Sequence, residues 1–245
     1  MKNKSWLILF ILVIPLLCLA EATIYEYKIH YAGLPVAHVT IRVESGDSTR
    51  IITLESTSKG LISALFPVEN TYVSSCDDKY IPKHFWKTIY QQNVQEKKVI
   101  IFDQTDGKIV IRDTMVEKVY TLSCNTPIYD IVSMTFSLLQ EVPKKATYTC
   151  YGNYRIWELA VEQEKIVELS FQRKKYPCCE YMITSAIEFD SKISSKTDIL
   201  TNNIFKENGK TQYWITKDKP HLLLKAKYKR FPFSIYLYLS SIATQ

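Results

Sequence analysis

The chain has 245 residues, of which 47% are hydrophobic and 13% aromatic, and it contains few glycines. This composition can bury a substantial core, and the absence of a fixed-period repeat argues against a propeller or solenoid. The formal net charge of +6 becomes +5 if a leader containing Lys2, Lys4 and Glu21 is removed, and the basic residues are spread out, which argues against a nucleic-acid partner.

The first 22 residues have the organisation of a secretory signal peptide. Lys2 and Lys4 form the positive amino-terminal region, residues 6–19 form the apolar region, and Ala20-Glu21-Ala22 is a small-x-small cleavage site. We therefore expect export to the periplasm with cleavage after Ala22, which leaves residues 23–245 as a single β-rich domain.

Two other interpretations of the leader are weaker. The apolar run is shorter than the roughly 20 residues of a membrane-spanning helix, and Pro15 interrupts it. No later segment is apolar enough to span a bilayer, so we expect no integral membrane protein. Lipid attachment at Cys18 is the second alternative, but Leu16 and Leu17 precede it where lipidation normally requires a small residue.

The pattern of a β-hairpin follows the leader, with apolar residues at every second position on both sides of a turn. Because side chains of a strand alternate between the two faces of a sheet, each apolar set lies on one face, and pairing brings the two sets together. In this register Tyr31 opposes Ala37, and His30 opposes His38 on the other face. The apolar sets flank a Gly33-Leu34-Pro35 turn and consist of Tyr25, Tyr27, Ile29 and Tyr31 before it and Ala37, Val39, Ile41 and Val43 after it.

Most of the remaining chain also has the pattern of strands joined by hairpins. Asp106-Gly107, Gly152-Asn153 and Asn208-Gly209 favour tight turns, because these residues tolerate positive φ angles. The short connections leave no room for crossover helices, so the strand order is antiparallel. The predicted strands are 24–32, 35–44, 50–58, 69–76, 83–91, 97–103, 108–112, 146–151, 154–161, 199–207 and 210–216, and the alternation continues to Leu239.

One segment has helical periodicity. Apolar residues recur at helical spacing after Thr126, which can cap a helix, and Pro127, which is tolerated in a first turn. We expect a helix over Thr126–Gln140 that covers a sheet face or plugs one end of a curved sheet. A shorter helix or turn is expected around Gly60–Leu65. The predicted fold is therefore mainly β: a curved antiparallel sheet, or an open β-barrel or clam built from hairpins, with one short α-helix packed against it.

Five cysteines remain after removal of the leader, which fits an oxidising compartment. Five thiols cannot all pair internally, and the connectivity stays open. Cys178 and Cys179 point to opposite faces of an extended strand, so bridges to different partners are favoured over a bridge between them. A zinc site is disfavoured, because there is no Cys-x-x-Cys pair and no histidine close by. The five cysteines are Cys76, Cys124, Cys150, Cys178 and Cys179.

Four motifs are spread over nearly the whole mature chain. They are Tyr27-x-x-x-Tyr31-x-Gly33-Leu34-Pro35-Val36, Gly60 with Leu65-Phe66-Pro67-Val68, Asp130-Ile131-Val132-Ser133, and Tyr213-Trp214-Ile215 with Asp218 and Pro220. With these motifs the sequence resembles the domain-of-unknown-function 3108 family of exported bacterial proteins. The resemblance implies a periplasmic, β-rich single domain with no established activity, and it transfers no catalytic residue.

No catalytic constellation is found in the sequence. There is no Gly-x-Ser-x-Gly elbow and no histidine in the context of a triad, so we expect no enzyme, with a hydrolase as the least favoured function. His30 and His38 are the best candidates for a metal or acid/base pair, but no third ligand has metal-site spacing, so we favour a solvated polar face and expect no metal or cofactor. Four carboxylates are expected on an exposed hairpin face: Glu158, Glu162, Glu164 and Glu168.

Two functions from different classes remain. The favoured one is a binding or carrier module that holds a lipid or other apolar or amphipathic ligand in the concavity of the sheet, with Thr126–Gln140 as plug or lid. The alternative is an envelope assembly or interaction factor that contacts an envelope protein through a sheet edge or the basic surface. The expected ligand-binding residues, each also typical of an ordinary core, are Tyr25, Tyr27, Trp86, Phe136, Trp157 and Trp214.

Overall fold

The computed structural model describes residues 21–125, 127–193, 197–230 and 232–245. The predicted leader up to Ala20 and the predicted cap Thr126 lie outside the described residues. The described part of the chain forms fifteen strands in one sheet and three short helices, which confirms the mainly β fold expected from the sequence. Within it, no helix is long and apolar enough to cross a membrane.

The first half of the chain is an up-and-down meander. Its eight strands follow one another as antiparallel hairpins, so neighbours in sequence are neighbours in the sheet. Helix α1 (Leu61–Leu65) lies between the third and fourth strands, where a short helix or turn is expected. The strands are β1 (Ala22–Tyr31), β2 (Leu34–Ser45), β3 (Arg50–Ser58), β4 (Val68–Cys76), β5 (Pro82–Gln91), β6 (Val94–Asp103), β7 (Lys108–Asp113) and β8 (Lys118–Ser123).

The second half is another meander, which joins the first because its last strand pairs with β1. The strand order is therefore β8-β7-β6-β5-β4-β3-β2-β1-β15-β14-β13-β12-β11-β10-β9. Among the described pairings, the contact of β9 with β10 is the one parallel pair. The elements are β9 (Ile128–Tyr129), α2 (Ile131–Glu141), β10 (Lys145–Gly152), β11 (Arg155–Phe171), β12 (Lys174–Asp190), α3 (Ile199–Ile204), β13 (Gly209–Thr216), β14 (Leu223–Tyr228) and β15 (Ile235–Thr244).

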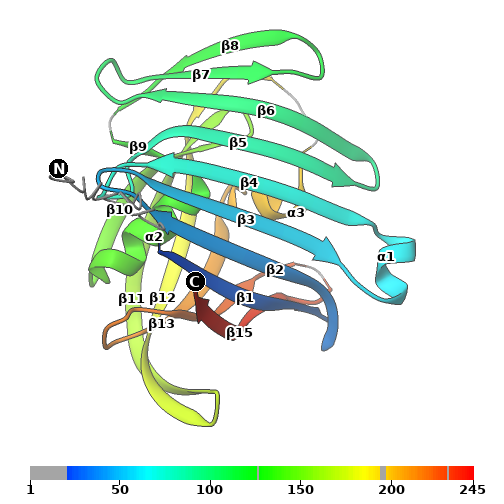
Figure 1. Ribbon diagram of the computed structural model, residues 1–245. Coiled ribbons are helices and arrows are strands. Elements are labelled where there is room, and N and C mark those ends of the chain that lie inside the picture. Colours follow the sequence, from blue (N-terminus) through cyan, green and yellow to red (C-terminus); the bar gives the residue numbers. More distant parts are fainter. Residues whose placement is uncertain (1–20, 126, 194–196, 231) are drawn as a thin grey trace, which may run out of the picture.

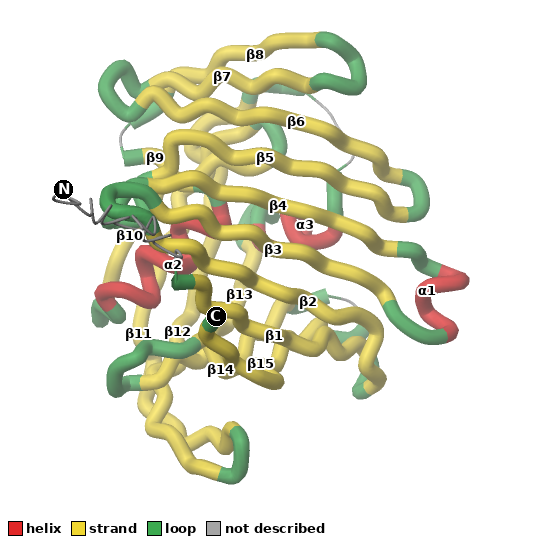
Figure 2. The backbone as a smooth tube through the Cα atoms, in the orientation of Figure 1, coloured by secondary structure: helices red, strands yellow, loops and turns green. Residues whose placement is uncertain are grey.

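The sheet curves so strongly that its two halves face each other. In Figure 1, β2–β8 form a front wall, β11 and β12 run behind it, and α2 lies at the left. Figure 2 shows α3 behind β4 and β5 in the same view. Gln104, which follows β6, contacts the edge strand β9: its side chain donates to the carbonyl of Ile128 (2.8 Å) and accepts from its N–H (3.0 Å). The curvature therefore brings the strand at one end of the sheet to the connection between β6 and β7.

Helix α2 begins later than predicted. Residues 128–129 are extended as β9, and Asp130 is the N-cap, with its carboxylate accepting from the N–H groups of Val132 (2.8 Å) and Ser133 (2.9 Å). Ser133 Oγ in turn accepts from the N–H of Asp130 (3.1 Å), which completes a capping box. This local pairing explains the motif at residues 130–133 and overrides the cap expected at Thr126.

A second helix packs on the inner face, where the sequence predicted a strand over 199–207. Helix α3 begins at Asp198, whose carboxylate accepts from the N–H of Thr201 (2.8 Å). The prediction of a strand is wrong because this N-cap satisfies the first turn of a helix, and a helix buries Thr201 and Ile204 on one side. Two helices, α2 and α3, therefore pack against the sheet, where the sequence predicted one.

The first hairpin has a different register from the predicted one. Ala32 and Gly33 adopt φ angles of 51° and 80° and form a two-residue turn in place of the expected three-residue turn. The shorter turn, together with an irregularity after residue 29, places Lys28 opposite His38. His30 instead pairs with residue 35, so the predicted pairing of His30 with His38 is wrong.

Strands β11 and β12 continue beyond their neighbours as a long hairpin, seen at the bottom of Figure 1. Its tip is a tight turn at Gln172 and Arg173, with φ angles of 48° and 66°. No glycine marked this turn in the sequence. The four carboxylates expected on an exposed face are exposed along β11: Glu158, Glu162, Glu164 and Glu168.

Gly152 provides a test of the packing between α3 and the sheet. A Cβ at this position would lie 2.3 Å from the ring of Phe205, which follows α3 and packs 5.8 Å from the Trp157 ring. We expect Gly152→Ala to lower the free energy of unfolding by about 1–3 kcal/mol in urea titrations, because overpacking displaces the ring. Gly46→Ala is the control, since its nearest contact is Thr49 Oγ1 at 3.3 Å. Equal losses in both variants would contradict this account.

Candidate functional site

An apolar cavity lies between the inner face of the sheet, α2 and α3. Its volume is about 540 Å³, which lies within the range of roughly 300–1,000 Å³ of small-molecule sites. The sheet contributes β1–β5 and β13–β15 to the walls. Side chains of the apolar part include Val39, Ile41, Leu54, Ile131, Val132 and Leu223.

The cavity is apolar at its inner end and more polar at its open end. Ser74 on β4 donates to Asp130 at the start of α2 (2.6 Å), so the beginning of β4 marks the end of the cavity away from α2. There Asn70 Nδ2 donates to Gln91 Oε1 (3.1 Å), and both side chains line the cavity. Arg230, which is exposed, is the one charged side chain in the described lining. An amphipathic molecule would thus meet polar groups at the mouth and apolar walls inside.

One of the six side chains expected to bind a ligand lines this cavity. Phe136 on α2 does so, and its ring centroid lies 6.2 Å from that of Tyr25. Tyr25 and Tyr27 are outside the lining, and Tyr27 is part of the buried core. Trp157 is also a core residue, whose Nε1–H donates to the carbonyl of Gly152 (3.0 Å). Contact of Phe136 with a ligand stays a prediction.

Trp86 and Trp214 lie on the outer face of the sheet, so the prediction that they line the concavity is wrong. Trp86 is 37% exposed, whereas its neighbour Lys87 is buried. Tyr213 lines the cavity, so Trp214 points the opposite way, where Lys225 Nζ lies 4.5 Å from its ring centroid. Aromatic size suggested these residues, but the strict alternation of side chains along a strand decides which face they occupy.

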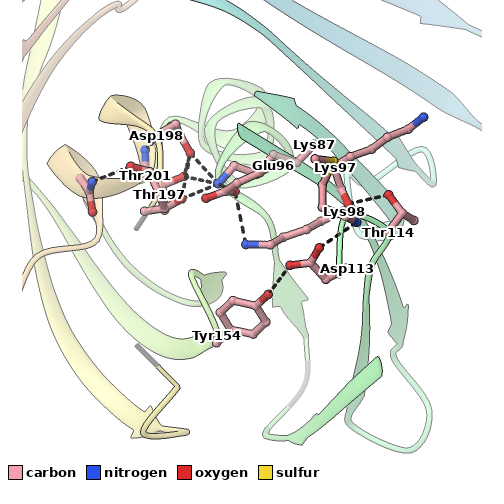
Figure 3. Close-up of polar contacts among 12 residues, drawn as sticks. Lys87, Glu96, Lys97, Lys98, Asp113, Thr114, Tyr154, Thr197, Asp198 and Thr201 are labelled. Carbon is pink, nitrogen blue, oxygen red and sulfur yellow. Dashed lines mark hydrogen bonds and ion pairs between the residues drawn. The ribbon is translucent and has the colours of Figure 1, made fainter. Parts of the chain in front are cut away.

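A cluster of four buried charges connects α3 to the sheet (Figure 3). Lys87 Nζ on β5 lies 2.5 Å from Asp198 Oδ2 and 2.8 Å from Glu96 Oε2. Lys98 Nζ on β6 lies 3.3 Å from the same oxygen of Glu96. Tyr72, which lines the cavity, donates to Asp198 Oδ1 (2.7 Å). Two ammonium groups thus face two carboxylates, and Asp198 is at once the cap of α3 and its electrostatic anchor.

Pairing outweighs burial at the centre of this cluster. Burial by itself raises the pKa of Asp198, but Lys87 and the hydrogen bonds from Thr201 and Tyr72 lower it to about 2. Burial lowers the pKa of Lys87, yet Asp198 and Glu96 more than compensate, so that pKa is raised. Both groups are therefore charged at neutral pH. Their attraction in a water-poor environment fastens α3 over the cavity.

This cluster is not evident in the sequence, because lysines in strands normally face solvent. One feature of the sequence could have indicated it. Lys87 is two residues after the apolar Phe85, so both side chains lie on the same face of β5, and Lys87 lies opposite Lys98 in the β5–β6 hairpin. Two lysines on an apolar face require carboxylates, and Glu96 shares that face. Asp198 is about a hundred residues away in the sequence, and only the closure of the sheet brings it to Lys87.

The described cysteines are free thiols, so the bridges favoured for Cys178 and Cys179 are not formed. Burial raises the pKa of Cys124 and of Cys178 to about 11. Burial, reinforced by the carboxylate of Asp130, raises the pKa of Cys150 well above its ordinary value. Such thiols are protonated at neutral pH and are weak nucleophiles. Among the described residues, no group of three or more His, Cys, Asp or Glu side chains is arranged to hold a metal ion.

The family model “Protein of unknown function (DUF3108)” matches residues 26–239. The chain therefore belongs to this family, which confirms the resemblance found in the four motifs. No curated protein matches the sequence.

Among solved structures, the chain is similar to the β-barrel-like protein of the DUF1849 family from Brucella abortus, with 12% identity, a TM-score of 0.55 and coverage of 92% of this chain and 98% of that one. A candidate lipoprotein from Parabacteroides distasonis has 11% identity, a TM-score of 0.39 and coverage of 91% and 95%. A protein with a YmcC-like fold from Bacteroides fragilis has 10% identity, a TM-score of 0.36 and coverage of 90% and 95%. The Brucella protein shares the fold alone.

Asp198→Asn tests the electrostatic anchor of α3. The variant leaves two buried ammonium groups facing the single carboxylate of Glu96, so we expect the free energy of unfolding at neutral pH to fall by about 3–5 kcal/mol in urea titrations. Asp190→Asn, which breaks the partly exposed pair with Arg155, serves as the control and should cost far less stability, because solvent screens that pair. A similar small loss in both variants would show that Asp198 is no anchor.

The same pair predicts a dependence on acid. Because folding lowers the pKa of Asp198 from its ordinary 3.8 to about 2, its stabilisation is complete above about pH 4 and is lost as the pH falls toward 2. Asp198→Asn lacks this group, so we expect its stability to decline less than that of the unchanged protein over this interval. Urea midpoints measured between about pH 5 and pH 2 test this, and parallel curves would contradict it.

Proposed function

We propose that this member of the DUF3108 family is an exported, periplasmic, non-enzymatic protein that binds or carries an amphipathic ligand such as a lipid in its cavity. The observation that carries the proposal is the apolar cavity of about 540 Å³ enclosed by the sheet, α2 and α3. A void of this size with apolar walls lowers the stability of a fold unless it is filled, because its lining atoms lack packing partners. A bound apolar group restores those contacts.

The polarity of the lining supports an amphipathic ligand. Asn70, Gln91 and Arg230 lie toward the open end, whereas Ile131 and Val132 of α2 line the inner end. An apolar tail would therefore lie toward α2, with its polar group near the mouth. The signal-peptide pattern of the first 22 residues supports export.

A non-enzymatic role is supported by the positions of the histidine, cysteine and aspartate side chains that could serve as catalytic groups. His38 is opposite Lys28 in the first hairpin, away from a partner histidine. Cys76 and Cys150 are buried. Asp130 is committed to the N–H groups that begin α2. None of these four side chains is among those that line the cavity.

The alternative function, an envelope assembly or interaction factor, is favoured by one observation. Strand β8 is an edge of the sheet, and large apolar side chains at and beside it are more than half exposed: Met115, Val116 and Val119. An exposed edge can pair with a strand of another chain. This function requires no ligand in the cavity, so the two proposals are separated by a search for one.

Extraction of the protein purified after export provides that search. We expect organic solvent to release a lipid in about equimolar amount, since a site of this size holds one small ligand, with mass spectrometry of the extract as the readout. The refolded, ligand-free protein should enhance the fluorescence of N-phenyl-1-naphthylamine. Absence of both a stoichiometric lipid and probe binding would reject the carrier function and leave the interaction factor.

Leu54→Trp tests whether binding takes place in the cavity. The larger side chain occupies its inner part, so we expect at least a tenfold loss of N-phenyl-1-naphthylamine affinity. Thr53→Trp, on the outer face of the same strand, is the matched control and should bind normally. Saturated fatty alcohols should displace the probe about fourfold more tightly for each added methylene until the cavity is full. Equal affinity in both variants would place the site elsewhere.

A further inference from the structure

Three chain segments surround the mouth of the cavity, and together we call them the rim. They are residues 31–36 at the β1–β2 turn, residues 59–67 including α1, and the described residues of 229–235 before β15. Tyr31 and Phe233 join two of them by an edge-on ring contact at 5.8 Å, and the N–H of Lys59 donates to the carbonyl of Val36 (3.3 Å), which joins the third. In Figure 1 the β1–β2 turn and α1 lie on the same side of the molecule.

Each rim segment presents a large apolar side chain to solvent. Leu34, Leu65, Phe66 and Phe233 are all more than half exposed. Phe66 also lines the cavity, so this apolar surface continues into the cavity. Packing within the chain does not require such exposure, and contiguous exposed apolar residues on a folded protein mark a surface that contacts another apolar phase.

The charge of the rim has one sign. Its three segments contain no aspartate or glutamate, and their basic residues Lys59, Lys229 and Arg230 are all exposed. None of these three basic groups forms an ion pair in the described structure. Apolar side chains flanked by unpaired cations are the combination that binds an anionic bilayer, because one inserts between lipid chains and the other attracts headgroups.

We propose that the rim docks the protein on the surface of an anionic lipid bilayer, with the mouth of the cavity facing the membrane. Leu65, Phe66 and Phe233 insert at the boundary of headgroups and acyl chains, while Lys59 and Lys229 lie at the level of the phosphates. In this orientation a lipid passes between bilayer and cavity along the apolar surface of Phe66, without crossing water. The docking goes beyond the proposed function and rests on it only for this transfer step.

Vesicle flotation with the exported protein tests the proposal. We expect binding to vesicles of phosphatidylcholine mixed with phosphatidylglycerol, weaker binding to phosphatidylcholine alone, and loss of the difference at high salt. Lys59→Gln with Lys229→Gln should weaken binding to the anionic vesicles about 25-fold, about fivefold for each lysine, and leave binding to neutral vesicles unchanged. Leu65→Ser with Phe233→Ser should weaken binding to both.

The matched control lies in the β11–β12 hairpin, which projects at the bottom of Figure 1. Ile166 and Lys174 are exposed there, and Ile166→Ser with Lys174→Gln removes the same kinds of group. The control should bind vesicles normally, and all variants should keep the thermal unfolding temperature of the unchanged protein. Absence of vesicle binding, or an equal loss in the control, would overturn the docking. Conversion of a dimer to a monomer by the rim variant in sedimentation velocity would overturn it too, and assign the rim to a second copy of the chain.

The two proposals fail separately. Rim variants should bind N-phenyl-1-naphthylamine in solution with unchanged affinity, because they leave the cavity walls intact. Vesicle binding without probe binding would reject the carrier function and retain the docking surface. Probe binding without vesicle binding would reject the docking surface and retain the carrier function.

Discussion

The structure depends on one constraint: a sheet of fifteen strands has one apolar face, and that face must be kept from water. The chain meets this by curvature. Pairing of β15 with β1 joins two meanders, and the combined twist of their strands turns the inner faces toward each other. Because a curved sheet of this length does not collapse completely on itself, the two halves leave space that α2 and α3 occupy only in part. The cavity is the part that remains.

The two inner helices are held by polar groups rather than by apolar packing alone. Asp130 begins α2 and accepts from Ser74 of β4, while Asp198 begins α3 and faces Lys87 of β5. Burying either carboxylate without these partners would cost free energy. The partners are within reach in only one arrangement of the helix on the sheet. Specific polar contacts at the helix starts therefore position apolar side chains along the cavity. Exposed apolar and basic residues gather instead around the mouth, in the three rim segments.

Prediction from the sequence succeeded where the determining interactions are local. Alternation identified most strands, and turn dipeptides identified several hairpins, because both depend on neighbouring residues. It failed for the first hairpin register, where a two-residue turn at Ala32 and Gly33 replaced the expected longer one. It also failed for 199–207, where an N-cap at Asp198 produced a helix. Of the expected binding residues, Phe136 lines the cavity, whereas Trp86 and Trp214 occupy strand positions whose side chains point to the outer face of the sheet.

The sequence by itself determined the export pattern, the β class, the antiparallel order and the family, since each follows from composition, short-range periodicity or motifs. Tertiary structure alone decided which residues meet across the curved sheet. Lys87 and Asp198 are brought together by closure of the sheet, and so are the rim segments around Tyr31, Phe66 and Phe233. The physical reason is that enclosure is a property of the whole sheet: the sum of strand twists and the joining of β1 to β15 set it, and no local pattern encodes that sum.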